Sequence, residues 1–459
     1  MTSPADVETI DQLRAGLDGS VIGPSDAEYD EARTVFPGGF ERRPAAIVRP
    51  ADASQVAQIV SFARETGLEL AVRSGGHSAA GHGLVDGGIT LDLAAMRDLD
   101  FDLERRTAWA QTGLTAGEYT KAAGAHGLAT GFGDTGSVGI GGLTLGGGVG
   151  FLSRLHGLTI DDLLAAELVT ADGQILEIDA ENHPDLFWAI RGGGGNFGVA
   201  TRFKFRLHEL ESVVGGMLML PATAAVVRSF LAEADEAPDE LSTIASVMPA
   251  PPMPFVPAEH HGQLVVMALL CYAGSTEDGE RVLAPFRSLA TPLVDMVRPI
   301  PYPELYPPDQ EDFHPTAIGH TMFLNGVDDD AAEMIIERLE SSDAAMRVTQ
   351  LRVLGGAIAR MPDEATAYAH RGSRIMANVA SFYEGPEDKS VREAWVNDLA
   401  AELRQDAAGA YVNFLGDEGE ERIRAAYPGA TWDRLAKVKA EYDPTNLFRH
   451  NQNIPGSRS

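Results

Sequence analysis

The chain has 459 residues, 44% of them hydrophobic and 22% charged, which is ordinary for a globular protein and suits two or three domains. Its 67 acidic residues against 36 basic ones give a net charge of −31, so we expect neither nucleic acid nor an anionic membrane surface as a partner. The single cysteine, Cys271, excludes an intramolecular disulfide, and because residues 1–20 lack a signal-type apolar segment we expect a cytoplasmic protein.

The N-terminal region contains a predicted β-α-β unit. Residues 44–48 are predicted to form a strand, and a helix follows whose apolar residues recur at i, i+3, i+4 and i+7. We expect Ser54 to cap this helix and Gly67 to end it, with a second strand over 68–72. Further strands are predicted over 89–93 and 107–111, and a helical stretch over 119–126.

The second strand leads into a glycine turn, RSGGHS, at residues 73–78. Gly75 and Gly76 let the backbone turn sharply and approach a ligand, and successive N–H groups in such a turn suit phosphate. The imidazole of His77 can form a covalent bond through a ring nitrogen. A tight surface turn with an ordinary histidine explains these residues equally well.

Two further stretches are rich in glycine. Residues 131–150 hold ten glycines, but the interleaved Val138, Ile140 and Leu143 indicate a folded loop rather than a flexible linker. Residues 192–198 match the dinucleotide-binding pattern GxGxxG, yet that pattern should open a helix, whereas 199–207 alternate like a strand, so we reject a Rossmann turn. The neighbouring elements predicted are strands over 163–170 and 174–178 and a helix over 184–190.

From about residue 212 the chain has less glycine and more helix, which indicates a second domain with a mostly antiparallel sheet and helices on one face. A helix is predicted over 222–234, and strands over 264–272, 321–327, 346–354 and 375–382. A last helix carries apolar residues from Trp432 to Tyr442 and ends before Pro444. The tail after it contains Leu447, Phe448 and Ile454, so we expect it to dock onto the protein.

Four motifs, in order along the chain, resemble one known family. They are RSGGHS at 73–78, GIGGLTLGGGVG at 139–150, LFWAIRGGGGNFGV at 186–199 and YDPTNLFRHNQNIP at 442–455. Together they resemble the berberine-bridge-enzyme-like FAD-linked oxidases, which have the vanillyl-alcohol-oxidase or PCMH-type FAD-binding fold. The resemblance implies an α+β fold: a two-subdomain FAD-binding domain over 1–211 with its core at about 40–210, a substrate-binding domain over 212–410, and a segment over 411–459 that returns to the FAD domain.

The resemblance assigns cofactor contacts by motif position. His77 would bond covalently to the 8α-methyl group of the flavin, and the N–H groups of residues 73–78 would hold the pyrophosphate. The other residues placed beside FAD are Arg73, Ser74, Gly75, Gly76, Ser78, His82, Thr135, Val138, Gly139, Gly141, Gly142, Gly146, Gly148, Val199, Asn413, Asn451 and Asn453. A metal site at His77 and His82 is conceivable, but no clustered ligands accompany the pair and we expect no metal.

Two departures from the family pattern affect the chemistry. Many relatives carry a cysteine, and with it a second covalent link, where this chain has Thr135, so we expect a single link through His77. Several relatives use as a base the second tyrosine of a YxNY segment, which here ends in Phe414. If this segment is a strand, Tyr411 and Asn413 share the face opposite Phe414, so Tyr411 cannot simply replace the missing hydroxyl.

The candidates for catalytic residues are Tyr411 itself and four residues of the substrate domain. Gln350 and Arg352 share one face of a predicted strand and are candidates for polar substrate contacts, although a solvated edge explains them as well. We expect any base to come from the substrate domain, with Tyr368, His370 or a residue beside Gln350 as candidates, or the substrate to be acidic enough to ionise unaided. A plain surface turn explains Tyr368 and His370 as well.

The resemblance implies an FAD-dependent oxidase in which a substrate C–H bond delivers a hydride to flavin N5 and molecular oxygen reoxidises the flavin to give hydrogen peroxide. We favour a small secondary metabolite as substrate, because the second covalent link and an obvious aromatic sugar platform are both missing. The alternatives are a carbohydrate oxidase of the same family and a flavin-binding protein that performs a non-redox cyclisation or isomerisation. We expect a monomer or a homodimer.

Overall fold

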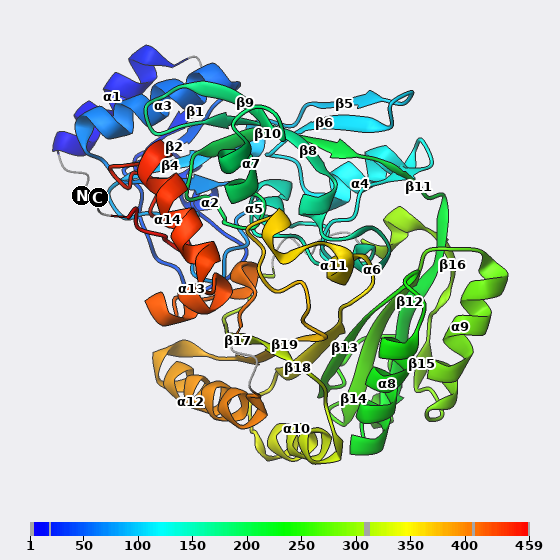
Figure 1. Cartoon of the computed structure of the whole chain (residues 1–459). Coiled ribbons are helices and arrows are strands. Elements are labelled where there is room, and N and C mark those ends of the chain that lie inside the picture. The colour runs from blue at the N-terminus through cyan, green and yellow to red at the C-terminus, as the bar shows by residue number, and fades with distance from the viewer. Residues whose placement is uncertain (1–3, 18–19, 307–312, 406–408, 458–459) are drawn as a thin grey trace.

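The computed structural model describes residues 4–17, 20–306, 313–405 and 409–457. Two smaller sheets and their helices occupy the upper half of Figure 1, and one large sheet with helices on its outer side occupies the lower half. The last helix returns to the upper half, beside the N-terminal region. None of the described helices is both long and apolar enough to cross a bilayer.

The first sheet has four strands, in the order β1 (Ser20–Ile22), β2 (Ala46–Arg49), β4 (Ile89–Asp92) and β3 (Leu70–Arg73). β2 and β3 both run parallel to β4, and helix α3 (Ala53–Thr66) makes the crossover between them. α3 buries the apolar face predicted from its spacing and ends at Gly67, whose φ is +72°. Two more helices, α1 (Pro4–Gly16) and α2 (Tyr29–Ala32), lie on either side of β1 in sequence.

The cap of α3 corrects the sequence prediction. Asp52, not Ser54, is the N-cap, because its backbone is extended and its carboxylate accepts a hydrogen bond from the Gln55 N–H at 2.9 Å. Ser54 already lies inside the first helical turn.

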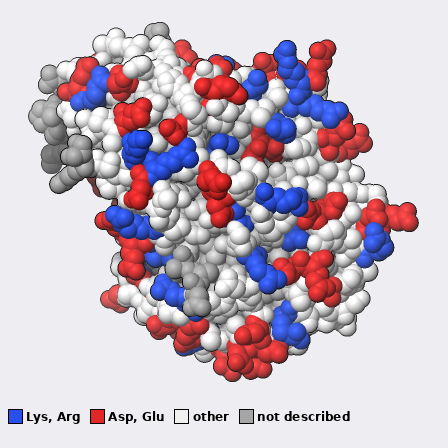
Figure 2. All heavy atoms as spheres, viewed as in Figure 1, with Lys and Arg blue, Asp and Glu red and all other residues white. Residues whose placement is uncertain are grey.

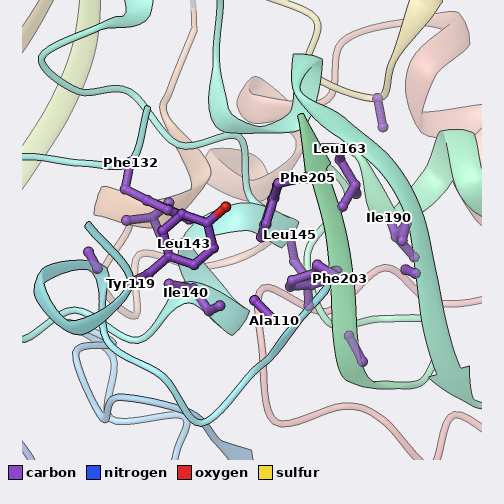
Figure 3. Close-up of a cluster of buried hydrophobic side chains, with 14 of the residues drawn as sticks. Ala110, Tyr119, Phe132, Ile140, Leu143, Leu145, Leu163, Ile190, Phe203 and Phe205 are labelled. Atoms are coloured by element: carbon purple, nitrogen blue, oxygen red, sulfur yellow. The ribbon is translucent and has the colours of Figure 1, made fainter. Parts of the chain in front are cut away.

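The second sheet has five antiparallel strands, in the order β5 (Leu99–Asp102), β6 (Thr107–Gln111), β10 (Val199–Arg206), β8 (Leu163–Val169) and β9 (Ile175–Asp179). Packed with it are α4 (Ala116–Gly124), α5 (Ile140–Leu145), α7 (Pro184–Ile190) and the pair β7 (Leu128–Ala129) and β11 (His208–Glu209). Its core contains Tyr119, Phe132 and Phe205, whose rings meet edge to face with centroids 4.8 to 5.8 Å apart (Figure 3). β10 directly follows residues 192–198, which agrees with rejecting a Rossmann turn there.

The third sheet is the large one, and all of its described strand pairs are antiparallel. Its order is β15 (Val294–Asp295), β12 (Ser212–Pro221), β14 (Leu264–Tyr272), β13 (Leu241–Pro249), β18 (Arg347–Val353), β19 (Ile375–Phe382) and β17 (Ala317–Leu324), with β16 (Arg298–Pro301) also on β12. One face is covered by α8 (Ala224–Glu236), α9 (Thr276–Ser288), α10 (Asp329–Ser341) and α12 (Gly385–Leu403). The predicted α+β class, with helices on one face of an antiparallel sheet, is confirmed.

The structure also describes four further helices and six 3₁₀ turns. They are helices α6 (Ser153–His156), α11 (Ala357–Arg360), α13 (Glu420–Ala426) and α14 (Ala430–Tyr442), and 3₁₀ turns η1 (Leu93–Ala95), η2 (Thr159–Asp161), η3 (Ala258–His260), η4 (Tyr302–Leu305), η5 (Asp363–Ala365) and η6 (Val412–Phe414).

The tail after α14 is held by a fully buried lysine, Lys439. Its Nζ donates to Asp443 Oδ2 at 2.6 Å, to the Asn196 carbonyl at 2.8 Å and to the Phe448 carbonyl at 2.9 Å. These bonds use all three ammonium donors. Phe448 and Ile454 are buried, so the tail docks through the apolar residues that set it apart in the sequence.

The net charge of −31 is carried on the surface. Figure 2 shows acidic and basic side chains interspersed over the visible face, with an acidic group at the lower edge, over α10. A mixed surface with an acidic excess is sufficient for solubility and needs no charged partner.

Candidate active site

A cavity of about 1130 Å³ lies between the loops of the first two sheets and the face of the large sheet that bears no helices. Its wall includes parts of all three glycine-rich stretches, the C-terminal tail, and β17, β18 and β19. The volume suits a ligand larger than most small-molecule substrates.

The first two glycine-rich stretches touch through glycines. A Cβ on Gly75 would lie 2.2 Å from the Gly139 nitrogen, and a Cβ on Gly139 would lie 2.2 Å from the Gly75 nitrogen. Ser74 fastens the contact, because its hydroxyl donates to the Thr112 carbonyl at 2.6 Å and accepts from the Gly141 N–H at 3.2 Å. These loops therefore pack more closely than any residue with a side chain would allow.

The glycine turn beside the cavity has backbone N–H groups without a protein partner in the described chain. Among the residues described, the N–H groups of Gly75, Gly76 and Ser78 donate to no protein acceptor, and all three residues line the cavity. Gly76 has a φ of +70°, which favours glycine at this position. Such a turn can hold the oxygens of a phosphate.

The third glycine-rich stretch is bound to the tail through amides. Asn196, 1% exposed, donates to the Gln452 carbonyl at 3.1 Å and accepts from the Ile454 N–H at 2.9 Å. Asn451 donates to the Gly195 carbonyl at 3.2 Å, and its Oδ1 is buried without a partner among the described residues. Asn451 lines the cavity, so this oxygen is an acceptor that a bound group with an N–H or O–H would satisfy.

His77 stands on the cavity wall with its ring stacked on Phe36, at a centroid distance of 4.2 Å and an angle of 15°. His82 lines the same cavity, and burial together with Arg42 lowers its pKa to about 4, so its ring is neutral at physiological pH. In the described part of the chain, no three His, Cys, Asp or Glu side chains cluster as a metal site would require.

Thr135 also lines the cavity and donates through its hydroxyl to Asp134 Oδ1 at 3.1 Å. The only thiol of the chain, Cys271, is fully buried in β14, and burial raises its pKa. No thiol therefore reaches the cavity.

The segment 411–414 is not a strand, which corrects the premise used for Tyr411. η6 follows Tyr411, and the tyrosine hydroxyl oxygen accepts from the N–H groups of Gly148 at 3.0 Å and Val149 at 3.2 Å. It also accepts from Asn413 Nδ2 at 3.0 Å, and the same Nδ2 donates to the Leu143 carbonyl at 3.0 Å. Since a carbonyl only accepts, that second bond fixes the orientation of the amide.

Three N–H donors thus converge on the Tyr411 oxygen, and Tyr411 lines the cavity. Burial raises the pKa of this phenol, whereas Asn413, the two backbone N–H groups and Arg352 oppose the rise. Hydrogen bonds of this kind stabilise a phenolate more than a phenol.

Gly146, Gly148 and Asn453 were assigned to the cofactor, but none of the three lines the cavity. Gly146 instead makes room for Asn413, since a Cβ there would lie 1.9 Å from Asn413 Oδ1. Gly148 donates to Tyr411. The other cofactor positions named from the sequence all line the cavity.

Gln350 and Arg352 form the opposite wall, on the face of β18 that looks toward the glycine loops. Arg352 donates to Gln350 Oε1 from Nε at 3.1 Å and to Asp134 Oδ2 from Nη2 at 2.5 Å, and its guanidinium lies 5.2 Å from the centre of the Phe414 ring. Its side chain is only 6% exposed, so it is not part of a solvated edge.

Tyr368 and His370 do not line the cavity. Tyr368 is buried in a cluster with Phe323 and Ile358, and His370 is bonded through Nε2 to the Ala425 carbonyl at 3.0 Å. Both belong to the packing around the site, and the structure gives neither of them access to a substrate.

Several polar residues on the wall were not identified from the sequence, among them Asp134 and Asn378. Asp134 belongs to a glycine-rich stretch, where it resembles an ordinary turn residue, and its pairing with Arg352 crosses 218 residues. Asn378 lies opposite Gln350 in the β18–β19 register, and its Oδ1 is buried without a partner among the described residues. An asparagine within the mostly apolar strand IMANVASF is the signal that was available.

Comparison with known proteins identifies the family. The FAD binding domain model matches residues 44–179, and the berberine and berberine-like model matches residues 410–455. Over 424 residues the chain is 31% identical to an FAD-linked oxidoreductase of Dictyostelium discoideum, which covers 90% of this chain and 88% of that protein. The chain belongs to the berberine-bridge-enzyme-like FAD-linked oxidoreductases.

Two further similarities extend over nearly the whole of this berberine-bridge-enzyme-like chain. It is 30% identical over 465 residues to (R)-6-hydroxynicotine oxidase of Paenarthrobacter nicotinovorans, covering 95% of this chain and 97% of the relative. The crystal structure of 6-hydroxy-D-nicotine oxidase from Arthrobacter nicotinovorans superposes with a TM-score of 0.85 over 95% of this chain and 98% of that one, at 29% identity.

The cavity fits the FAD that this family binds. Within the described chain, its wall has backbone N–H groups without a protein partner in the glycine turn, and an amide oxygen without a partner at Asn451. The contact between Gly75 and Gly139 brings two backbone segments together with no side chain between them. Residues 73–78 would hold the pyrophosphate, and Asn451 would meet a polar edge of the ring. When bound, FAD supplies the acceptor for a hydride.

Proposed function

We propose that this FAD-linked oxidoreductase is an oxidase: a small organic substrate gives up a hydride from a C–H bond and a proton from an O–H or N–H, and molecular oxygen receives the electrons to form hydrogen peroxide. The observation that carries the proposal is the cavity of about 1130 Å³, which joins the glycine loops to the polar wall of β18 and β19. The similarity to (R)-6-hydroxynicotine oxidase over almost the full length supports an oxidase.

We further propose one covalent link to FAD, through His77. His77 is on the cavity wall, Thr135 occupies the position at which relatives carry a cysteine, and Cys271 is buried elsewhere. A ring nitrogen of the His77 imidazole would be the atom that forms the bond to the flavin.

The substrate we favour is a small secondary metabolite with a hydrogen-bonding group. Gln350, Asn378 and the Arg352–Asp134 pair provide donors and acceptors side by side on one wall, and Phe414 adds an aromatic surface. Such a wall orients one polar group of the substrate and leaves the C–H bond to be directed toward the flavin.

The proton acceptor we propose is Tyr411. Its three N–H donors would stabilise the phenolate that accepts a proton, and nearby Arg352 adds a positive charge. Tyr368 and His370, which lie outside the cavity, are no longer proposed.

Anaerobic mixing of the holoenzyme with a panel of alcohols, phenols, amines and oligosaccharides tests the function. The expected result is loss of the oxidised-flavin absorbance with a member of the panel, followed by hydrogen peroxide when oxygen is admitted. Conversion of a panel compound to an isomer or ring-closed product, with the flavin still oxidised throughout, would establish the non-redox alternative instead.

A further inference from the structure

One ion pair lies on the wall that β18 contributes to the main cavity. Arg352 Nη2 donates to Asp134 Oδ2 at 2.5 Å, and the two residues are 218 positions apart in the chain. Both residues line the cavity. Because their unit charges cancel, the ion pair offers a bound molecule a donor side and an acceptor side but no net charge.

Other contacts hold both partners in place. Arg352 also donates to Gln350 Oε1, from Nε at 3.1 Å and from Nη2 at 2.8 Å, and its guanidinium lies 5.2 Å from the centre of the Phe414 ring. Asp134 accepts from the Thr135 hydroxyl at 3.1 Å. The side chains of Arg352 and Asp134 are 6% and 19% exposed, so little bulk water reaches the pair and its charges act strongly on a neighbouring ligand.

Neighbouring ionisable groups add no net charge to this part of the cavity. Burial lowers the pKa of His320 on β17 and raises the pKa of the Tyr411 phenol, so both side chains are neutral at neutral pH. Glu418, which contacts His320 at 3.4 Å, is paired with Arg422 at 2.9 Å. The ion pair on β18 therefore determines the charge that a ligand meets there.

Further charged side chains line the cavity in other surroundings. Three of them are exposed to solvent, which screens their charge: Lys389, Glu393 and Asp417. Arg73 opens the glycine turn and donates to Asp92 at 2.8 Å, and Arg42 donates to the Gly81 carbonyl at 2.6 Å, just after that turn. Those two arginines therefore belong to the cofactor side of the cavity.

We propose that this ion pair selects a substrate whose polar group is neutral and carries both a donor and an acceptor, as a carboxamide does, and that Asp134 sets this selectivity. The inference rests on the proposed function, since it takes the cavity as the place where the substrate of the oxidase binds. A neutral group gives up less hydration than an ion, and the Asp134 carboxylate has further lone pairs to accept its N–H or O–H.

Charged substrates are disfavoured by the same pair. An anion would meet a guanidinium already neutralised by Asp134, and a cation would meet a carboxylate already neutralised by Arg352. Either ion would lose its water without gaining a free opposite charge, which makes its burial costly. Removing one partner should therefore reverse the preference toward ions of that partner's own sign.

Three planar molecules of nearly the same shape test the selectivity: neutral benzamide, anionic benzoate and cationic benzamidine. Each is titrated calorimetrically into the oxidised holoenzyme at neutral pH. We expect benzamide to bind about tenfold or more tightly than either ion, the usual effect of one or two hydrogen bonds with charged groups. A holoenzyme that binds an ion as tightly as benzamide, or that binds none of the three, would overturn the proposal.

Two variants should shift the order in opposite directions. Asp134→Asn keeps the shape of the side chain and frees the charge of Arg352, so benzoate should become the tightest ligand. Arg352→Gln frees the charge of Asp134, so benzamidine should become the tightest. Glu393→Gln, which removes a carboxylate from an exposed position on α12, should keep the wild-type order. An unchanged order in Asp134→Asn with full flavin content would contradict the assignment, and this variant with the wild type decides if Arg352→Gln does not fold.

The titrations involve no turnover, so they separate this inference from the proposed function. The expected binding orders, together with a flavin that no compound of the anaerobic panel reduces, would support the recognition site and count against the oxidase. Reduction of the flavin by a member of the panel, together with equal binding of the three probes, would support the oxidase and refute the role of Asp134.

Discussion

At the scale of single residues, the proposed attachment point of the cofactor and the proposed proton acceptor come from opposite ends of the chain. His77 follows β3, while Tyr411 precedes η6, and both line one cavity. Each has a feature that the sequence could not provide: His77 is stacked on Phe36, and Tyr411 receives N–H donors from residues more than 260 positions away.

His77→Ala should leave no flavin on the polypeptide after denaturation, while the denatured wild type should remain yellow and fluorescent. The reason is that His77 is the proposed attachment point and no thiol reaches the cavity. Fluorescence of the denatured, gel-separated protein measures this, with His82→Ala as the matched histidine control. Flavin found on another residue, or on two, by peptide mapping would contradict the prediction.

Tyr411→Phe should lower the rate of substrate oxidation by about 10²–10⁴-fold, the usual contribution of a general base, with flavin content unchanged. Because the pKa of Tyr411 is raised, the phenol is protonated at neutral pH, and the wild-type rate should climb from pH 7 to pH 9 without a plateau. Steady-state kinetics across that range measure both effects. A variant that keeps the wild-type rate and slope would exclude Tyr411.

At the scale of elements, apolar strand-like runs and one amphipathic helix could be predicted from the sequence. β14 and β19 have the predicted bounds, and α3 buries the predicted face. β13 is buried along its whole length and β12 contains two successive glycines, so neither shows a clear alternation. The short helix α5 forms within the glycine-rich stretch because its neighbours pack around it, which propensity does not reveal.

Residues of the candidate site could be predicted only where they belong to a recognisable sequence motif or share a face of a predicted strand. The glycine stretches and the tail indicated the cofactor side, and strand alternation correctly grouped Gln350 with Arg352. Tyr368 and His370 looked like surface residues in the sequence, but Tyr368 is buried and His370 is half-buried, because their neighbours in space come from distant segments. Asp134 and Asn378 became recognisable only through their cross-chain partners.

Gly75→Ala should abolish flavin incorporation and destabilise the protein. The added methyl would lie 2.2 Å from a backbone nitrogen of the facing loop, which cannot move aside as a flexible side chain can, and overpacking of this kind typically costs about 1–3 kcal/mol or more. Flavin content and Tm measure the effect. Gly372→Ala is the control, since nothing lies within 4 Å of a Cβ there. Equal behaviour of the two variants would show that the loops can separate.

Lys439→Met should destabilise the protein by about 3–5 kcal/mol, because it leaves the buried Asp443 carboxylate without its positively charged partner. Chemical denaturation measures the change. Lys437→Met, on an exposed position of the same helix, should be near neutral. A loss below about 1 kcal/mol for Lys439→Met would show that the backbone N–H groups of Leu447 and Phe448 suffice for Asp443.

At the scale of the whole molecule, the cofactor side of the cavity is assembled from both ends of the chain. Asn196, between β-strands of the second sheet, bonds to Gln452 and Ile454 of the tail. A chain that stops after residue 420 should therefore contain no flavin, although RSGGHS is intact. Flavin content of the purified soluble product measures this, with a chain ending at Gly456 as the control. Full flavin content in the shorter product would show the tail to be dispensable.

The two walls of the cavity have separate origins, since one consists of loops and the tail and the other of neighbouring strands in the large sheet. Residues at alternate positions on β18 and β19 can thus be substituted without changing the loops and tail that would hold the cofactor. A laboratory library at Gln350, Asn378 and Ala380 should yield variants that accept new substrates and still mature with flavin. Such a division lets one scaffold diversify its chemistry by small steps on two strands.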